Sequence, residues 1–134
     1  MPSPDLDLVD YLAGAGLGLT KGTNIFVGPV RDMTPQIPDN SVFVTTRGGR
    51  LPVRTMGLQE EVRSPLIFIR IRNKNYDTGY NLAKAIMTSL MSGGVAGYLD
   101  IEPMQSEPNF LQTDSKNRLM WDLSYLMKYG EVSA

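Results

Sequence analysis

Two short strings in this sequence contain residue types that carry chemistry in other proteins. Residues 14–18 (Gly-Ala-Gly-Leu-Gly), followed by Lys21, are glycine-rich like a phosphate-binding loop, whose backbone N–H groups and lysine hold phosphate oxygens. The tripeptide Asp77-Thr78-Gly79 occurs in aspartic proteases, where two close carboxylates share one proton. The glycine string, however, follows a predicted helix instead of a strand. Asp77 stands in the first turn of another predicted helix, where a carboxylate favours the helix dipole. We therefore interpret the first string as a turn and the second as a helix start.

The polar run from Asp114 to Arg118 places a carboxylate and a guanidinium near each other, and an ion-paired turn is its simplest interpretation. The sequence contains no histidine and no cysteine, so the commonest near-neutral acid–base group and the thiolate metal ligand are both missing. We identify no nucleophile–base pair. The sequence therefore predicts no catalytic residue, no cofactor and no metal site, and an enzyme is the weakest class of function.

Charge is unevenly distributed, although the net charge is only −1. Residues 1–46 carry two basic and five acidic side chains, a net charge of −3. Residues 47–74 carry seven basic and two acidic side chains, a net charge of +5, and residues 95–134 carry three basic and six acidic side chains, a net charge of −3. A basic middle between acidic ends suits self-association, in which arginines of one subunit meet carboxylates of another. It also suits a surface that faces nucleic acid, although a dedicated DNA-binding domain is usually basic overall. A solvated charged loop is the third interpretation.

The length of 134 residues predicts a single domain, 1–134, because domains typically contain about 100–150 residues. No apolar run approaches the roughly 20 residues of a membrane helix, and the acidic N-terminus is unlike a signal peptide. We therefore expect no membrane partner. The absence of cysteine fits a reducing compartment.

Hydrophobic periodicity predicts two helices. A short N-terminal helix lies within residues 1–16, with Asp5 and Asp7 near its positive end and glycines after it. The central helix, from about residue 76 to residue 91, has an apolar stripe that can pack on a sheet. The stripe consists of Tyr76, Tyr80, Ala83, Met87 and Leu90.

Strands are predicted where β-branched and aromatic residues alternate or cluster, at 24–27, 41–46, 66–72, 98–102 and 119–129. In the last of these, Trp121, Tyr125 and Tyr129 share one face. We interpret them as core residues rather than as a ligand- or base-stacking platform. Met120 and Leu126 lie on the opposite face, which we expect a neighbouring subunit to cover in part.

Residues 47–65 are predicted to form a long, mobile loop, because they contain Gly48-Gly49, Pro52 and Gly57. Long connections in compact domains tend to be functional or disordered until bound. This segment is therefore the best candidate for a working surface.

The order of these elements resembles the small minor capsid or tail-terminator (tail completion) proteins of long-tailed bacteriophages. The resemblance covers about residues 24–129, including a proline-rich segment at 28–39. It is carried by the strand end Arg70-Ile71-Arg72, the pair Tyr76-Asp77, the helix to Met91, Asn109-Phe110-Leu111, and Asp114 and Arg118 before the final strand.

This resemblance implies an α+β fold, in which the central amphipathic helix and the N-terminal helix pack on a mixed, mostly antiparallel sheet. It implies a non-enzymatic virion structural protein that forms a ring, usually a hexamer, at the head-proximal end of the tail. The ring would cap the tail tube, stop its polymerisation and provide the head-joining surface. The implied partners are the protein itself, the tail-tube protein, the head–tail connector protein and DNA that passes through the lumen without sequence-specific binding. Assembly would take place in the host cytoplasm.

A ring requires two different patches on each subunit, which meet on successive neighbours. The predicted interface consists of charged residues of the loop and the adjoining strand: Arg47, Arg50, Arg54, Glu60, Glu61, Arg70 and Arg72. The loop arginines would contact either the next subunit's carboxylates or the tube and the DNA in the lumen. The two glutamates would keep the loop from gripping DNA that must slide past.

Two rival functions remain at this stage. A head-completion or tail-tube component of the same particle would share the fold style, and would be distinguished by whether the pure protein forms closed rings or open tubes. A monomeric α+β module of ferredoxin-like build would use the same helix-on-sheet packing to bind a peptide or a small ligand. That module would remain a stable monomer.

Overall fold

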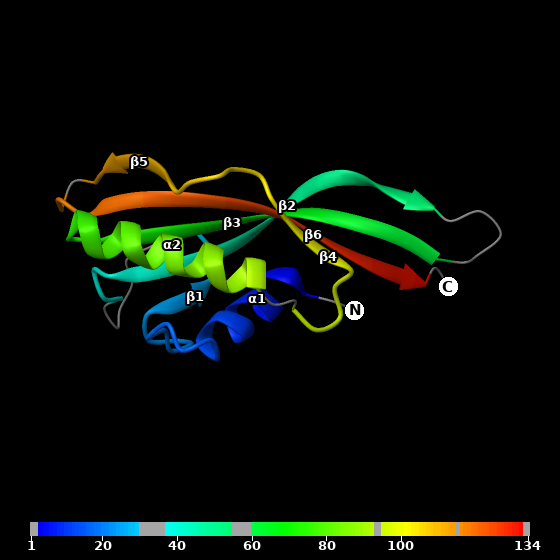
Figure 1. Cartoon of the computed structure of the whole chain (residues 1–134), viewed down its shortest axis with the longest axis horizontal. Helices are drawn as coiled ribbons and strands as arrows, with labels where there is room; N and C mark the ends of the chain where they lie inside the picture. The colour runs from blue at the N-terminus through cyan, green and yellow to red at the C-terminus, as the bar shows by residue number, and fades with distance from the viewer. Residues whose placement is uncertain (1–2, 30–36, 55–59, 93–94, 115, 133–134) are drawn as a thin grey trace.

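The computed structural model describes residues 3–29, 37–54, 60–92, 95–114 and 116–132, without the side chains of residues 50–61, 92 and 131–132. Its helices are α1 (Pro4–Ala13) and α2 (Tyr76–Ser92). Its strands are β1 (Ile25–Val27), β2 (Ser41–Arg54), β3 (Glu60–Asn73), β4 (Asp100–Pro103), β5 (Asn109–Thr113) and β6 (Leu119–Val132) (Figure 1). Neither of these helices is long and apolar enough to cross a membrane.

The six strands form one sheet in the order β1-β2-β3-β6-β4, with β5 also paired to β6. The pairing of β1 with β2 is parallel, and the other four pairings are antiparallel. This arrangement confirms the α+β fold with a mixed, mostly antiparallel sheet and two helices. β5 was not predicted as a strand.

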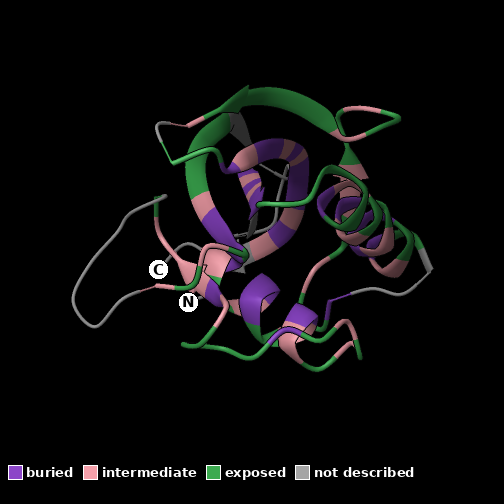
Figure 2. Cartoon of the chain, turned by 90° about the vertical axis from the view of Figure 1, so that its left-hand side faces the viewer, coloured by how far each residue is buried: buried purple, intermediate pink, exposed green. Residues whose placement is uncertain are grey.

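One face of the sheet packs against both helices and forms the hydrophobic core (Figure 2). Alternate residues of β3, Ile67, Ile69 and Ile71, are fully buried there, because successive strand residues point to opposite faces. From the other layer, α1 contributes Leu8, Val9 and Leu12, and α2 contributes Ala83, Ile86, Met87 and Leu90. Trp121, Tyr125 and Tyr129 are also buried, which confirms that these rings are structural.

The expectation of a loop at 47–65 is wrong for the described part of that segment. β2, β3 and β6 are each 14 residues long and continue beyond the helices as a three-stranded arm (Figure 1). Within the arm, Arg54 of β2 lies opposite Glu61 of β3, which in turn lies opposite Glu131 of β6. Residues 55–59 of the predicted loop lie outside the described residues.

Glycine and proline suggested a loop, but the ladder accommodates them at irregular positions. The register between β2 and β3 shifts on either side of Arg50, and Gly49 and Pro52 fall within those two shifts. Gly49 has a φ of +76°, and a Cβ atom there would lie 2.2 Å from the carbonyl oxygen of Ser64. The bulge therefore requires glycine at this position.

A neighbouring subunit is not needed to cover Met120 and Leu126. The chain itself leaves them only 6% and 2% exposed, so their burial gives no reason to expect a neighbouring subunit over this face. Each is flanked across the ladder by a long β3 side chain, Arg72 beside Met120 and Leu66 beside Leu126.

The tripeptide Asp77-Thr78-Gly79 lies in the first turn of α2, as its structural interpretation predicted. Gly79 is buried against Trp121. A Cβ atom at residue 79 would lie 2.3 Å from Cζ3 of that indole. The glycine therefore allows the helix to approach the largest side chain of the core.

We expect Gly79→Ala to destabilise the protein by about 1–3 kcal/mol, because the extra methyl group must displace a fully buried ring. In an exposed helix position, a change from glycine to alanine would stabilise the folded protein by up to about 1 kcal/mol. Urea unfolding measures the difference. Gly48→Ala is the control, since a Cβ atom there meets nothing within 4 Å. A Gly79 variant as stable as the wild type would contradict this packing.

Candidate functional site

The sheet face opposite the helices, here called the outer face, carries most of the predicted interface residues that can be described. The ladder places side chains of three strands in rows across it. One row contains Phe43, Arg70 and Asp122, and the next contains Thr45, Phe68 and Ser124. Arg47 follows on β2, two residues beyond Thr45 and therefore on the same face.

A pocket of about 70 Å³ opens on this face. Its lining residues are Gly28, Pro29, Phe43, Thr45, Arg47, Phe68 and Arg70. We call it the arginine pocket. The guanidinium of Arg47 lies 5.0 Å from the centre of the Phe68 ring, in a cation–π contact. The pocket thus combines an aromatic floor with two guanidinium groups.

Asp122 lies beside the pocket and compensates only part of its positive charge. Its Oδ1 is 3.8 Å from Nε of Arg70, too long for a hydrogen bond, and among the described residues neither buried atom has a hydrogen-bond partner. Burial raises the pKa of the Asp122 carboxyl, and the nearby guanidinium groups of Arg70 and Arg47 offset this only in part. Arg70 therefore forms a loose ion pair with Asp122, and Arg47 adds a second positive charge to the pocket.

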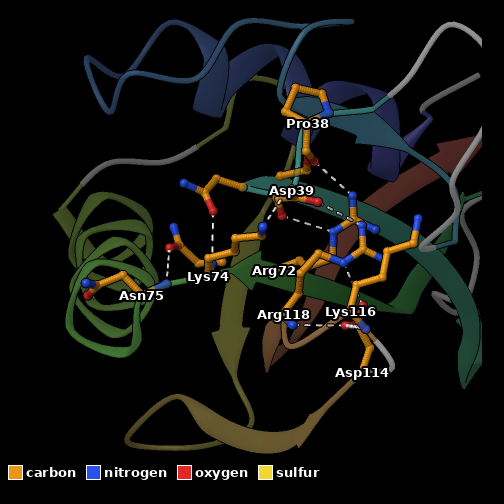
Figure 3. Close-up of polar contacts among 11 residues, drawn as sticks. Pro38, Asp39, Arg72, Lys74, Asn75, Asp114, Lys116 and Arg118 are labelled. Atoms are coloured by element: carbon orange, nitrogen blue, oxygen red, sulfur yellow. Dashed lines mark hydrogen bonds and ion pairs between the residues drawn. The ribbon is translucent and has the colours of Figure 1, made fainter.

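Arg72 belongs to the predicted interface by sequence, but the structure buries it completely. It donates hydrogen bonds to the carbonyl oxygens of Asp39 (3.1 Å) and Pro38 (2.8 Å), and its guanidinium lies 5.2 Å from the centre of the Phe43 ring (Figure 3). In this chain it therefore holds the segment before β2 against the sheet. It is not available to a partner.

Arg118 reinforces the same segment from the other side. Its Nε donates to Asp114 at 2.7 Å and its Nη1 lies 3.3 Å from Asp39, which also pairs with Lys74 at 3.2 Å (Figure 3). The predicted ion-paired turn from Asp114 to Arg118 is confirmed. The hydrogen bond from Lys74 and the charge of Arg118 hold the pKa of the Asp39 carboxyl below its usual value, although some desolvation opposes them.

The four other predicted interface residues lie in the arm, and their side chains are outside the described part of the chain. Their backbone pairing is described: Arg54 lies opposite Glu61, Arg50 opposite Ser64, and Glu60 opposite Val132. Opposite charges facing each other on neighbouring strands favour the hairpin. Their role at an interface remains a prediction.

A second hollow lies on α1, and sequence reasoning did not identify it. It has a volume of about 340 Å³ and is lined by Asp7, Asp10, Tyr11, Val95 and Ala96. We call it the acidic recess. Asp7 accepts a hydrogen bond from the Tyr98 hydroxyl at 2.6 Å, whereas Asp10 is paired at the surface with Lys21 at 2.9 Å. The spacing of the two carboxylates, three residues apart on a helix, was the available sequence signal.

Lys21 pairs with Asp10, a carboxylate of α1, and residues 14–18 form the turn that follows this helix. This placement supports the structural interpretation of the glycine-rich string.

A family model described as bacteriophage tail terminator protein matches residues 11–130 of the chain. No curated protein matches the chain at a significant level. The matched span includes all residues of the arginine pocket and the cationic contacts around Asp39. It excludes the first two turns of α1.

We expect Asp114→Asn to lower the free energy of unfolding at pH 7 by about 2 kcal/mol, because a buried guanidinium loses a charge-assisted hydrogen bond. Burial raises the pKa of Asp114, but hydrogen bonds from the Arg118 and Lys116 backbones and from the Arg118 side chain lower it more. A lowered folded-state pKa means that this stabilisation is present above the ordinary value of 3.8 and is lost as the pH falls below it.

Urea unfolding of both proteins across this pH range tests the prediction. The difference between them should shrink under acid conditions. Asp100→Asn is the control, since Asp100 is exposed and 4.0 Å from Lys128, and it should change stability by less than about 1 kcal/mol. A difference that is independent of pH would contradict the assignment.

Proposed function

The chain belongs to the bacteriophage tail terminator family, and we propose that it ends the growth of the tail tube by forming a closed ring on it. The family match over residues 11–130 carries this proposal. The protein is accordingly a structural component of the virion. We place the ring, a hexamer in our proposal, at the head-proximal end of the tail, where it also provides the surface that joins the head.

The shape and charge of the subunit support assembly into a ring. A cyclic assembly needs two different surfaces on each subunit, and the rotation between them must close. The outer face of the sheet carries the arginine pocket, whereas the helical side carries the acidic recess. The three-stranded arm extends beyond the helices and can reach a neighbouring molecule (Figure 1).

We propose that charged residues of β2 and β3 form the contact with the next subunit, the tube or the DNA in the lumen. These residues are Arg47, Arg50, Arg54, Glu60, Glu61 and Arg70. Arg72 is left out because it is buried under Pro38 and Asp39. The mixed charge of the arm would allow DNA to pass without sequence-specific binding, since basic groups alone would hold the phosphates.

The partners in this proposal are copies of the same chain, the tail-tube protein and the head–tail connector protein. Assembly takes place in the host cytoplasm before the particle is complete. No catalytic step is required, because capping a polymer needs only a binding surface that does not present the next tube site.

The direct test is the length of tail tubes polymerised from purified tube protein with and without this chain, measured by negative-stain electron microscopy. We expect shorter tubes that carry a ring at one end. Native mass spectrometry of the same mixture should show a single closed ring mass. Open tubes formed by this chain alone would indicate a tail-tube component instead. A chain that stays monomeric with and without tubes would indicate a monomeric binding module.

We further expect that replacing Arg47, Arg50 and Arg54 together with serine weakens ring formation by about tenfold or more, since exposed ion pairs contribute up to about 1 kcal/mol each. The fold should be retained, as judged by circular dichroism. The matched control replaces Lys74, Lys84 and Lys128 with serine, which removes the same charge from exposed or partly exposed ion pairs elsewhere. Equal assembly of the arginine variant and the wild type would contradict the proposed interface.

A further inference from the structure

The arginine pocket and the acidic recess are two oppositely charged hollows in the described part of the chain, and they lie on opposite sides of the sheet. α1 packs through Leu8, Val9 and Leu12 on the core face. The pocket is built from β2 and β3 side chains that alternate with core residues, such as Phe43 between Val42 and Val44. A pocket and a recess placed in this way cannot meet within one chain. They can meet only between two copies.

The arginine pocket has the chemistry of a carboxylate site. Arg47 is exposed, and Nε of Arg70 is buried without a hydrogen-bond partner among the described residues. Arg70 forms an ion pair with Asp122 at 3.8 Å but keeps 32% of its side chain exposed, so a further carboxylate can still reach its guanidinium. The aromatic floor of Phe43 and Phe68 lowers the local dielectric constant, which strengthens an ion pair formed against it.

The acidic recess can supply that carboxylate. Asp10 protrudes from α1 with 55% of its side chain exposed, and its partner Lys21 is 51% exposed, so their pair is weak and exchangeable. Asp7 is less available, because the Tyr98 hydroxyl already binds it. The recess is about 340 Å³, against about 70 Å³ for the pocket, and it therefore has room for the Arg47 side chain of another copy.

We propose that the arginine pocket of one copy faces the acidic recess of the next copy, so that Asp10 pairs with Arg47 and Arg70. The contact is heterologous, because each copy uses its outer face toward one neighbour and α1 toward the other. Such a contact propagates around a ring. The inference rests on the proposed function for its setting and names the two surfaces that the ring would join.

Charge exchange between two variants tests this contact. In Arg47→Glu, the pocket repels Asp10 of every other copy; in Asp10→Lys, the recess repels every pocket. We expect each variant alone to lose assembly by about tenfold or more, as measured by native mass spectrometry with tail tubes present. An equimolar mixture should assemble again with the two variants alternating, because both kinds of contact then join opposite charges. The double variant in one chain should assemble for the same reason.

Two matched variants control for the change of net charge. Lys84→Glu and Asp100→Lys reverse charges of similar exposure, each in a surface ion pair whose residues line neither hollow. They should assemble like the wild type. The mixture also controls for folding, since a variant that had not folded could not be rescued by the other.

A cysteine pair reports the contact by a second route, because the chain contains no cysteine of its own. Thr45 lines the pocket and Ala96 lines the recess. Mixing Thr45→Cys with Ala96→Cys under mild oxidation should give a heterodimer on a non-reducing gel, and neither variant alone should give one in comparable yield.

The outcomes separate this inference from the proposed function. Rings that form equally well in Arg47→Glu and Asp10→Lys would overturn the pocket contact and leave the ring proposal standing. Loss in both variants without rescue in the mixture would also overturn the contact. A wild-type chain that never associates, with or without tubes, would overturn both proposals.

Discussion

The pairing of β3 with β2 along one edge and with β6 along the other is the constraint on which the rest of this structure depends. All three strands are 14 residues long, and their shared register decides which side chains face the helices and which face away. A shift of one residue would exchange the isoleucine row of β3 for Phe68, Arg70 and Arg72, and would place charges in the core. The hydrophobic core and the charged outer face are therefore fixed by the same ladder.

Arginine has two different roles on that outer face. Arg72 and Arg118 are almost completely buried, and together they bind Pro38 and Asp39. Arg47 and Arg70 remain partly or fully accessible and line a pocket. The two pairs differ in burial because a segment of the chain covers only the first pair. Residues 38–39 supply carbonyl and carboxylate oxygens to the first pair, whereas no described segment supplies a full set of acceptors to the second pair.

The same division is consistent with a subunit that has two unlike sides. In the role that we propose, the chain must bind a growing tube and stop it, which requires surfaces that are complementary to neighbours but not to further tube subunits. In this chain, a basic and partly aromatic pocket lies on one side of the sheet and an acidic recess on the other. The long arm adds a third surface beyond the helices. Packing within the chain accounts for the buried core, whereas charge distinguishes the two hollows that remain at the surface.

The sequence by itself determined the fold class, both helices and the cores of five strands, because hydrophobic periodicity is a local property that survives in the folded chain. It also determined that Trp121 and Tyr125 are core residues and that Asp114 and Arg118 pair, since both follow from short spacings. Only the tertiary structure decided that residues 47–54 and 60–65 are strand rather than loop. Pairing with β6 gives residues 60–63 of β3 backbone partners from far along the chain, residues 47–54 of β2 pair with β3 in turn, and bulges absorb Gly49 and Pro52. The tertiary structure likewise decided that Arg72 is buried while Arg70 is not, because the covering segment is contributed by residues more than thirty positions away.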